Sequence, residues 1–323
     1  MCIAGRTARP AACKPLVGPR SIASCNRRRS EGEEHMLIGV GLALGAAAVW
    51  GVAITVAKPG ALRMDPVSFI RGRWILATLF ASAYAAATGL LVAPSPLAIV
   101  WVAAGALLDA LLGWVLYMMA MQRAPAYQVT TLASTTPLWG VLASFLLLGE
   151  PFRWSSLGAA LLVVVGSFFL VGKRDASMRE HRIGLLFAAL TGLLWGVAET
   201  VPMKKALALG VTPETMLVVY GAVALVGVLL LTPLLRRRFP RRVERGGYVF
   251  VVLSAICGAS IGWLLWMNGL RFADASLLSP IRGSTLLFAF VYSVVFLKER
   301  PSRFALIGVA LVFAGVLLVS LPG

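Results

Sequence analysis

Four ionisable side chains lie within long apolar runs of the sequence or at their entrances, and Asp109 lies deepest. It is about twelve residues into its run, which corresponds to roughly 18 Å along a helix. A charge in hydrocarbon costs several kcal/mol, so groups at such positions are usually functional. The position predicts a carboxylate that exchanges a proton or pairs with a cationic substrate. The alternative is a carboxylate that is held protonated, or hydrogen-bonded, against neighbouring helices.

Arg282 lies about six residues into a later apolar run, or about 9 Å along a helix. Its guanidinium is a candidate for binding an anion such as a carboxylate, because Gly283, Ser284 and Thr285 leave room and offer hydroxyls. The alternative is a side chain that extends to the membrane surface. The same two interpretations apply to Arg73, at the entrance of an earlier run.

Glu199 follows Trp195 by one helical turn and precedes Pro202 by almost one turn. Proline frees a backbone carbonyl in the preceding turn, so a carboxylate beside it predicts a gate or an ion site. The alternative is a helix-end carboxylate that pairs with Lys204 or Lys205.

Tryptophans recur at matching places in the two halves of the chain and are candidates for lining a substrate cavity. The candidates are Trp50, Trp114, Trp195 and Trp263, with Tyr117 and Trp266 one turn further along. The alternative is that these rings pack between the two halves. A pair of glycines, Gly41 and Gly45, predicts a face for close helix approach.

The elements that must position these residues are helices long enough to cross a membrane. Hydrophobic residues make up 59% of the chain and charged residues 13%, against about 25% charged residues in soluble domains. Runs of about 20 apolar residues predict transmembrane helices. The predicted spans are 37–57, 66–90, 97–120, 127–148, 155–172, 184–203, 215–235, 248–270, 276–297 and 304–320. The fold class expected is therefore all-α, an integral membrane protein with ten helices.

The ten spans divide into two similar halves. Trp50-Gly51 recurs as Trp195-Gly196, and Gly113-Trp114 recurs as Gly262-Trp263. The first half also has Pro66 seven residues before Arg73, an interior Pro137, the sequence Leu148-Gly149-Glu150, and Gly158 with Gly166. In the second half Tyr220 follows Pro213 at the matching distance, Leu286 stands where the interior proline would be, and Leu297-Lys298-Glu299 replaces Leu-Gly-Glu.

In these marks and their order, residues 36–323 resemble the EamA-type family of the drug/metabolite transporter superfamily. The resemblance implies two inverted five-helix repeats, at 36–172 and 183–322, in a multi-pass protein of the cell membrane. It implies a secondary carrier of small metabolites, with export the usual direction. Five helices per half place the second repeat in the opposite orientation, as alternating access requires.

The substrate expected is an amino acid or a related amphoteric compound, because Asp109 and Arg282 offer both charges. Proton coupling is expected through Asp109. Uptake or facilitated exchange of a nucleoside, sugar or cationic compound is the alternative, and a non-transporting scaffold or receptor is a more remote one. The partners expected are the substrate, the lipid bilayer and protons; the oligomeric state is left open. The cysteines have no paired metal-binding spacing, and neither metal nor cofactor is expected.

An enzyme is not expected. The run from Gly258 to Gly262 matches G-x-S-x-G, but that motif needs a strand-to-helix turn and a partner base. Here it lies in an apolar run, and His35 and His181 both lie outside the predicted spans.

The formal net charge of +17 reports membrane orientation rather than nucleic-acid binding. Loops after odd-numbered spans carry 16 Lys and Arg, against 4 after even-numbered spans. That count predicts cytoplasmic odd-side loops, whereas the family resemblance implies cytoplasmic termini, so the orientation is left open. The basic segment 1–35 is expected to be disordered, or to precede a true start at Met36.

Overall fold

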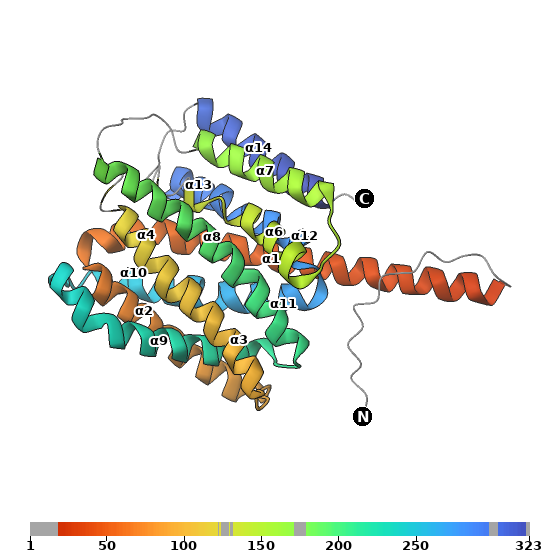
Figure 1. The fold of residues 1–323 in the computed structure, drawn as a ribbon, viewed down its shortest axis with the longest axis horizontal. Helices are drawn as coiled ribbons and strands as arrows, with labels where there is room; N and C mark the ends of the chain where they lie inside the picture. The colour runs from red at the N-terminus through yellow and green to blue at the C-terminus, as the bar shows by residue number, and fades with distance from the viewer. Residues whose placement is uncertain are drawn as a thin grey trace.

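The computed structural model describes residues 19–121, 123, 129, 132–170, 179–296 and 303–320. Every extended regular element in these ranges is a helix (Figure 1). A lone antiparallel bridge joins Met64 to Val243. Within the same ranges, six helices are long and apolar enough to cross a membrane, and three shorter apolar helices accompany them. The predicted fold class, an all-α membrane protein, is confirmed.

The helices of the first half follow the predicted spans closely. They are α1 (Pro19–Arg63), α2 (Pro66–Thr88), α3 (Pro96–Ala106), the π-helix η1 (Leu107–Gly113), α4 (Trp114–Met121), α6 (Thr136–Leu148) and α7 (Trp154–Leu170). Those of the second half are α8 (Arg179–Ala208), α9 (Pro213–Arg238), α10 (Gly247–Leu253), the π-helix η2 (Ser254–Ile261), α11 (Gly262–Phe272), α12 (Ala275–Arg282), α13 (Thr285–Phe296) and α14 (Arg303–Ser320).

Local chemistry sets several helix starts. Asp65, Ser95 and Thr212 are N-cap residues whose side chains accept a backbone N–H of the first turn. Each is followed by a proline, which is suited to the first helical position because it has no N–H to leave unpaired. Capping residues followed by proline can be recognised in the sequence, so the predicted starts of these helices are close to the observed ones.

The first helix begins earlier than expected. α1 starts at Pro19 and continues without interruption into the bundle. Its first turns project from the bundle as a single helix (Figure 1). The expected disorder of segment 1–35 therefore does not describe residues 19–35, and residues 1–18 lie outside the described ranges.

Two predicted spans are broken, which is a correction. The predicted span 276–297 ends as α12 at Arg282, turns at Gly283 and Ser284, and resumes as α13. In the first half α6 begins at Thr136 after a turn at residues 134–135, and much of 122–131 lies outside the described ranges. The two turns are 149 residues apart. Pro280, which donates no backbone hydrogen bond, precedes one break, and Pro137 follows the other.

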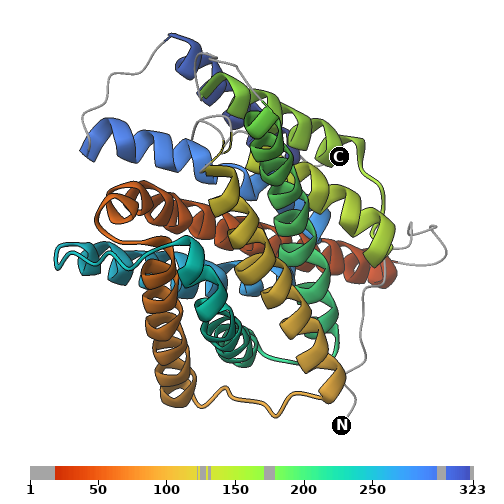
Figure 2. The ribbon, with the colours of Figure 1, turned by 60° about the vertical axis from the view of Figure 1, so that its left-hand side comes forward.

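The two halves exchange their first helices. α1 packs against α10 to α13 of the second half, and α8 packs against α3, α4 and α6 of the first. Both first helices run through the middle of the bundle in Figure 2, while α7 and α14 lie together at its edge in Figure 1. Residues on α1 and α8 are thereby placed at the contact between the repeats.

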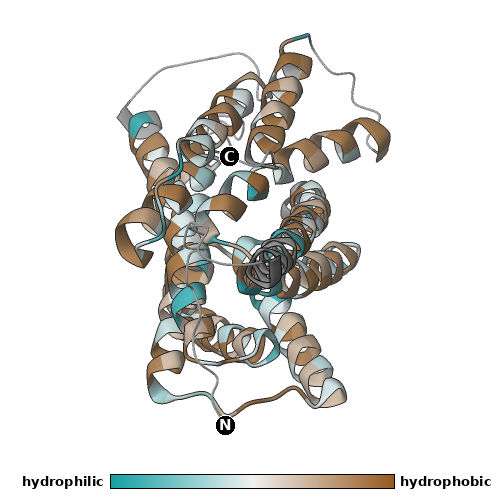
Figure 3. Cartoon of the chain, turned by 90° about the vertical axis from the view of Figure 1, so that its right-hand side faces the viewer, coloured by the Kyte–Doolittle hydropathy of each residue, from teal (hydrophilic) through white to brown (hydrophobic). Residues whose placement is uncertain are grey.

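The outer surface is apolar, as a lipid-facing surface must be. Large apolar side chains such as Leu79, Leu230 and Phe296 are exposed on it. Figure 3 shows apolar residues over most of the helices, with hydrophilic residues concentrated at turns and within the bundle.

A candidate substrate site between the two repeats

The tryptophan that opens each repeat reaches into the other repeat. The indole N–H of Trp50 donates to the carbonyl oxygen of Gly258 at 2.9 Å, and that of Trp195 donates to the carbonyl oxygen of Asp109 at 3.4 Å. Gly258 and Asp109 are equivalent positions, 149 residues apart, and lie in η2 and η1. A π-helix breaks the i to i−4 hydrogen-bond register, which leaves carbonyl groups for other donors.

The recurring Gly-Trp pairs explain this geometry. A Cβ atom added to Gly113 would lie 2.7 Å from Cδ1 of Trp195, and one added to Gly262 would lie 2.5 Å from Cδ1 of Trp50. The lack of a side chain at each glycine therefore leaves room for the indole ring of the other repeat. This is a packing role, as the alternative interpretation of the tryptophans expected.

Asp109 is buried, with 5% of its surface exposed, and accepts a hydrogen bond from the Tyr220 hydroxyl of α9. The contact joins the third helical segment of one repeat to the second helix of the other. Arg73, Arg282 and Glu199 all lie close enough to act electrostatically on Asp109. The candidate carboxylate thus lies within a group of charges at the contact between repeats.

Glu199 and Arg282 form a two-pronged ion pair. The guanidinium Nε and Nη2 donate to the two carboxylate oxygens at 2.5 Å each. The exposed fractions of the two side chains are 5% for Glu199 and 17% for Arg282. Arg282 therefore does not extend to the membrane surface, and that alternative is wrong.

The alternative interpretation of Glu199, a helix-end carboxylate paired with Lys204 or Lys205, is also wrong. The ammonium of Lys204 donates instead to the carbonyl oxygen of Ala273 at 2.7 Å. The Glu199 backbone carbonyl, next to the carbonyl that Pro202 frees, accepts the indole N–H of Trp266 at 2.8 Å. The carboxylate is directed into the bundle because the turn after α12 brings Arg282 to it.

All seven candidate residues belong to one connected set of contacts. Trp114 and Trp195 lie with ring centroids 5.8 Å apart, as do Trp50 and Trp263. The Arg282 guanidinium lies 5.3 Å from the centre of the Trp50 ring. Tyr220 links the two groups, since its ring lies 4.6 Å from Trp263 while its hydroxyl binds Asp109.

Arg73 is the cation that this set leaves least satisfied. It is 6% exposed, and its Nε donates to the Ser254 carbonyl oxygen at a long 3.4 Å. Its Nη1 has no hydrogen-bond partner among the residues that the structure describes. The guanidinium lies 4.9 Å from the centre of the Trp114 ring and 5.2 Å from that of Trp74.

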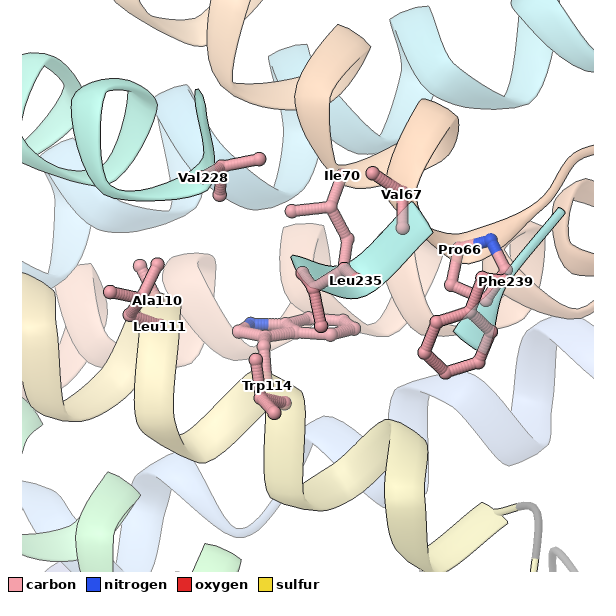
Figure 4. Close-up of a pocket in the computed structure, with 10 residues that line it drawn as sticks. Pro66, Val67, Ile70, Ala110, Leu111, Trp114, Val228, Leu235 and Phe239 are labelled. Atoms are coloured by element: carbon pink, nitrogen blue, oxygen red, sulfur yellow. The ribbon is translucent and has the colours of Figure 1, made fainter. Parts of the chain in front are cut away.

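The Trp114 ring that Arg73 contacts also lines an apolar crevice (Figure 4). It lies between α2, the η1–α4 segment and α9, and one wall is the Trp114 ring. The other lining residues are Pro66, Val67, Ile70, Ala110, Leu111, Val115, Val228, Leu235 and Phe239. The lining carries no charged side chain, so the crevice suits an apolar group or a lipid chain.

Two contacts between repeats lie outside the apolar interior. Glu150 accepts the backbone N–H groups of Ala275 and Ser276 at 2.9 and 2.8 Å, which caps the start of α12. Arg153 pairs nearby with Asp274 at 3.1 Å. Glu150 therefore caps a helix of the other repeat, whereas Glu299, its equivalent, lies outside the described residues.

On the opposite side of the bundle Asp65 makes the corresponding contact. It accepts from the Ser68 N–H, from Nη1 of Arg236 at 2.8 Å and from the Arg242 N–H at 3.0 Å. Burial alone would raise the pKa of Asp65, but these hydrogen bonds outweigh it and hold the pKa below its ordinary value. Two of the clustered arginines thus hold the repeats together here.

The G-x-S-x-G match lies in η2, where it forms no strand-to-helix turn. The Ser260 hydroxyl donates to the Ala255 carbonyl at 3.0 Å within its own helix. Nothing in this arrangement activates a nucleophile.

Tyr220 is the residue that sequence reasoning missed. Its distance from Pro213 matches that of Arg73 from Pro66, but in the sequence the change of residue type is visible only as a departure from the repeat. The signal was a second departure, since Gly258 stands where Asp109 stands in the first repeat. The two departures belong together because Tyr220 and Asp109 contact one another.

Comparison with known proteins agrees with this architecture. Residues 37–172 and 182–321 each match the model of the EamA-like transporter family. Protein PecM of Dickeya dadantii is 26% identical over 208 residues, which cover 64% of this chain and 68% of that protein. A protein described as an uncharacterized transporter in Archaeoglobus fulgidus is 24% identical over 219 residues, or 67% of this chain and 74% of that protein.

A solved crystal structure has a similar fold, with a TM-score of 0.75 at 22% identity, covering 89% of this chain and 98% of the other. At that identity the likeness concerns the fold alone. The two family matches span most of the chain and coincide with its two sets of helices. The chain belongs to the EamA-like transporter family and is a multi-pass membrane transporter.

Proposed function

We propose that the chain is a secondary carrier in the cell membrane that exports an amino acid or a related amphoteric metabolite, coupled to protons through Asp109. The observation that carries the proposal is the hydrogen bond between Asp109 and Tyr220. It places an ionisable group at the contact between two repeats that move relative to one another in carriers of this plan. Protonation of such a group changes how strongly the two repeats attract.

The charges around Asp109 support an amphoteric substrate. Arg73 and Arg282 provide two basic side chains here, and Asp109 and Glu199 provide two acidic ones. A substrate that brings one charge of each sign leaves this balance unchanged, so no net charge is added to a low-dielectric site. The surrounding tryptophan rings offer faces for an apolar or aromatic side chain and for an ammonium group.

Asp109→Asn tests the coupling role. Asparagine keeps an oxygen that accepts the Tyr220 hydrogen bond, but it cannot exchange a proton at neutral pH. In proteoliposomes supplied with a panel of amino acids and metabolites, we expect pH-gradient-driven flux to fall about tenfold or more, a change of about 1.4 kcal/mol. Counterflow exchange without a gradient should persist, because binding and the conformational change remain.

Glu244→Gln is the matched control, since Glu244 lies on the surface and its carboxylate pairs with the exposed Arg242. Unchanged gradient-driven flux in Asp109→Asn would reduce Asp109 to a packing role. Flux that does not depend on pH in the wild type would favour facilitated exchange. Flux of sugars, nucleosides or cations in place of amino acids would overturn the substrate class.

A further inference from the structure

We propose that Arg73 binds the anionic end of the transported metabolite, a carboxylate, while Trp114 and the adjoining crevice hold its apolar part. The inference rests on the proposed function and assigns the anion to a different residue from Arg282. It follows from three features of the described chain: an unpaired guanidinium nitrogen, a pseudo-symmetric position without a side chain, and the crevice.

Arg282 is already occupied. The edge of its guanidinium formed by Nε and Nη2 donates to both carboxylate oxygens of Glu199, and the pair is neutral. A substrate carboxylate would have to displace a buried, two-pronged ion pair to bind there, which leaves Glu199 unpaired at a cost of several kcal/mol. The structure thus directs an anion away from Arg282.

Arg73 has unused capacity. A guanidinium carries five N–H donors in a fixed fork that fits a carboxylate. In Arg73 the only hydrogen bond given by the described residues is the long one from Nε to Ser254, and Nη1 is buried without a partner. An unsatisfied buried donor costs about 1–3 kcal/mol, and more when it is charged. A bound carboxylate would satisfy it.

The internal repeat shows what is missing beside Arg73. Its equivalent, Tyr220, binds the carboxylate of Asp109, whereas the equivalent of Asp109 is Gly258. A Cβ at Gly258 would lie 3.0 Å from Nη2 of Arg73, so the guanidinium occupies the place of that absent side chain. The first repeat thus supplies the Asp109 carboxylate to Tyr220 of the second repeat. At the equivalent position the second repeat supplies only Gly258 to Arg73.

The crevice supplies the remainder of the site. The Trp114 ring forms one wall of the crevice (Figure 4). The Arg73 guanidinium lies 4.9 Å from the centre of the same ring. A molecule with an aromatic or branched apolar group at one end and a carboxylate two or three bonds away fits an apolar wall next to a cation. The same chemistry would be offered by a fatty acid, which the experiment must separate from a metabolite.

The test is ligand binding to the purified full-length protein, measured by calorimetry. The probes are 3-phenylpropionate, its neutral amide 3-phenylpropionamide, and decanoate as a fatty acid. We expect the carboxylate to bind about tenfold or more tightly than the amide, because only the former pairs with a guanidinium. Arg73→Gln should bind the two alike, and Arg73→Lys should keep part of the preference through its charge.

Arg271→Gln, which removes an exposed arginine, is the control and should keep the full preference. If Arg73→Gln does not fold, Arg73→Lys and the wild-type preference carry the test. Equal binding of carboxylate and amide by the wild type overturns the inference. So does loss of the preference in Arg282→Gln but not in the Arg73 variants, and so does tight binding of decanoate alone.

Failure of the proposed function is distinguishable from failure of this inference. A wild type that binds 3-phenylpropionate through Arg73 but moves no metabolite in proteoliposomes would retain the anion site and lose the transport proposal. A wild type that transports with protons but shows no Arg73-dependent preference would do the reverse.

Discussion

Tyr220 and Arg73 occupy equivalent positions in the two repeats. The residues that they face, Asp109 and Gly258, are also equivalent to one another. Tyr220 meets the carboxylate of Asp109, and Arg73 meets Gly258, which has no side chain. The two equivalent contacts therefore differ. One is a hydrogen bond between the side chains of Tyr220 and Asp109, and in the other the Arg73 guanidinium faces a glycine.

Asp65 makes a prediction about pH. Its pKa is lowered in the folded protein by hydrogen bonds from Ser68, Arg236 and Arg242 acting against burial. The stabilisation is therefore fully present above the ordinary aspartate pKa, about 3.9, and is lost as the pH falls through the lower folded value. Asparagine is an equally good N-cap, so Asp65→Asn isolates the charge.

We expect Asp65→Asn to lower the free energy of unfolding by about 1 kcal/mol at pH 7, since the Arg236 partner is part-exposed. Thermal unfolding in detergent at several pH values measures it. The difference between wild type and variant should shrink as the pH approaches and passes below 3.9. A difference that stays constant down to pH 3 would show that the carboxylate charge contributes nothing.

At the scale of the helices, the first helix of each repeat is held by a glycine beside the tryptophan. A Cβ on Gly196 would lie 2.6 Å from the Thr136 carbonyl oxygen, and one on Gly51 would lie 2.7 Å from Cβ of Phe288. Close approach of helices in lipid depends on such small residues. The Trp-Gly pairs therefore combine a ring that crosses between repeats with a gap that lets the next helix approach.

The pair expected to serve this purpose on α1 does not. Gly41 has no atom within 4 Å of an added Cβ, and Gly45 has only the side chain of Leu265 at 3.4 Å. Gly39 is the residue in close contact, with the Gly269 carbonyl oxygen 3.2 Å from its added Cβ. Spacing alone identified a face with small residues, but only the neighbouring helix decides which glycine is covered.

Gly196→Ala should therefore destabilise the protein. The added methyl meets the Thr136 carbonyl oxygen and the Cβ atom of Trp139, rather than the end of a flexible side chain. Overpacking of this kind costs about 1–3 kcal/mol. Gly41→Ala is the matched control and should be neutral or slightly stabilising, since alanine is the better helix former. Both are measured by unfolding in detergent or mixed micelles. Equal effects of the two substitutions would contradict the packing argument.

At the scale of the whole molecule, the two repeats are joined at both membrane edges by a carboxylate of the first repeat. Glu150 holds the start of α12 at one edge, and Asp65 holds Arg236 and the Arg242 backbone at the other. The two contacts lie at opposite ends of the bundle in Figure 1. Alternating access needs one edge to open while the other stays closed.

Removing one contact should therefore open its own edge and protect the other. Glu150→Gln is expected to speed hydrogen exchange of the Ala275 and Ser276 amides and to slow that of the Arg242 amide. Asp65→Asn should do the opposite. Hydrogen–deuterium exchange with mass spectrometry on peptides around 273–278 and 240–246 measures both. Faster exchange at both edges in either variant would indicate general loosening instead of alternation.

The amino-acid sequence by itself determined the membrane class, the family, most of the helical segments and the presence of Asp109 and Glu199 in the interior. Apolar runs, capping residues followed by proline, and the repeated Trp-Gly pairs are local signals, so they can be read along the chain. The boundaries of α2, α9 and α14 followed directly from them.

Only the tertiary structure decided how charges pair. The break after α12 brings Arg282 to Glu199, and the packing of α9 against η1 brings Tyr220 to Asp109. These contacts join residues 83 and 111 positions apart. Partners so distant are set by the packing of helices from two inverted repeats, which no local spacing records, because each helix is buried against the other half of the molecule.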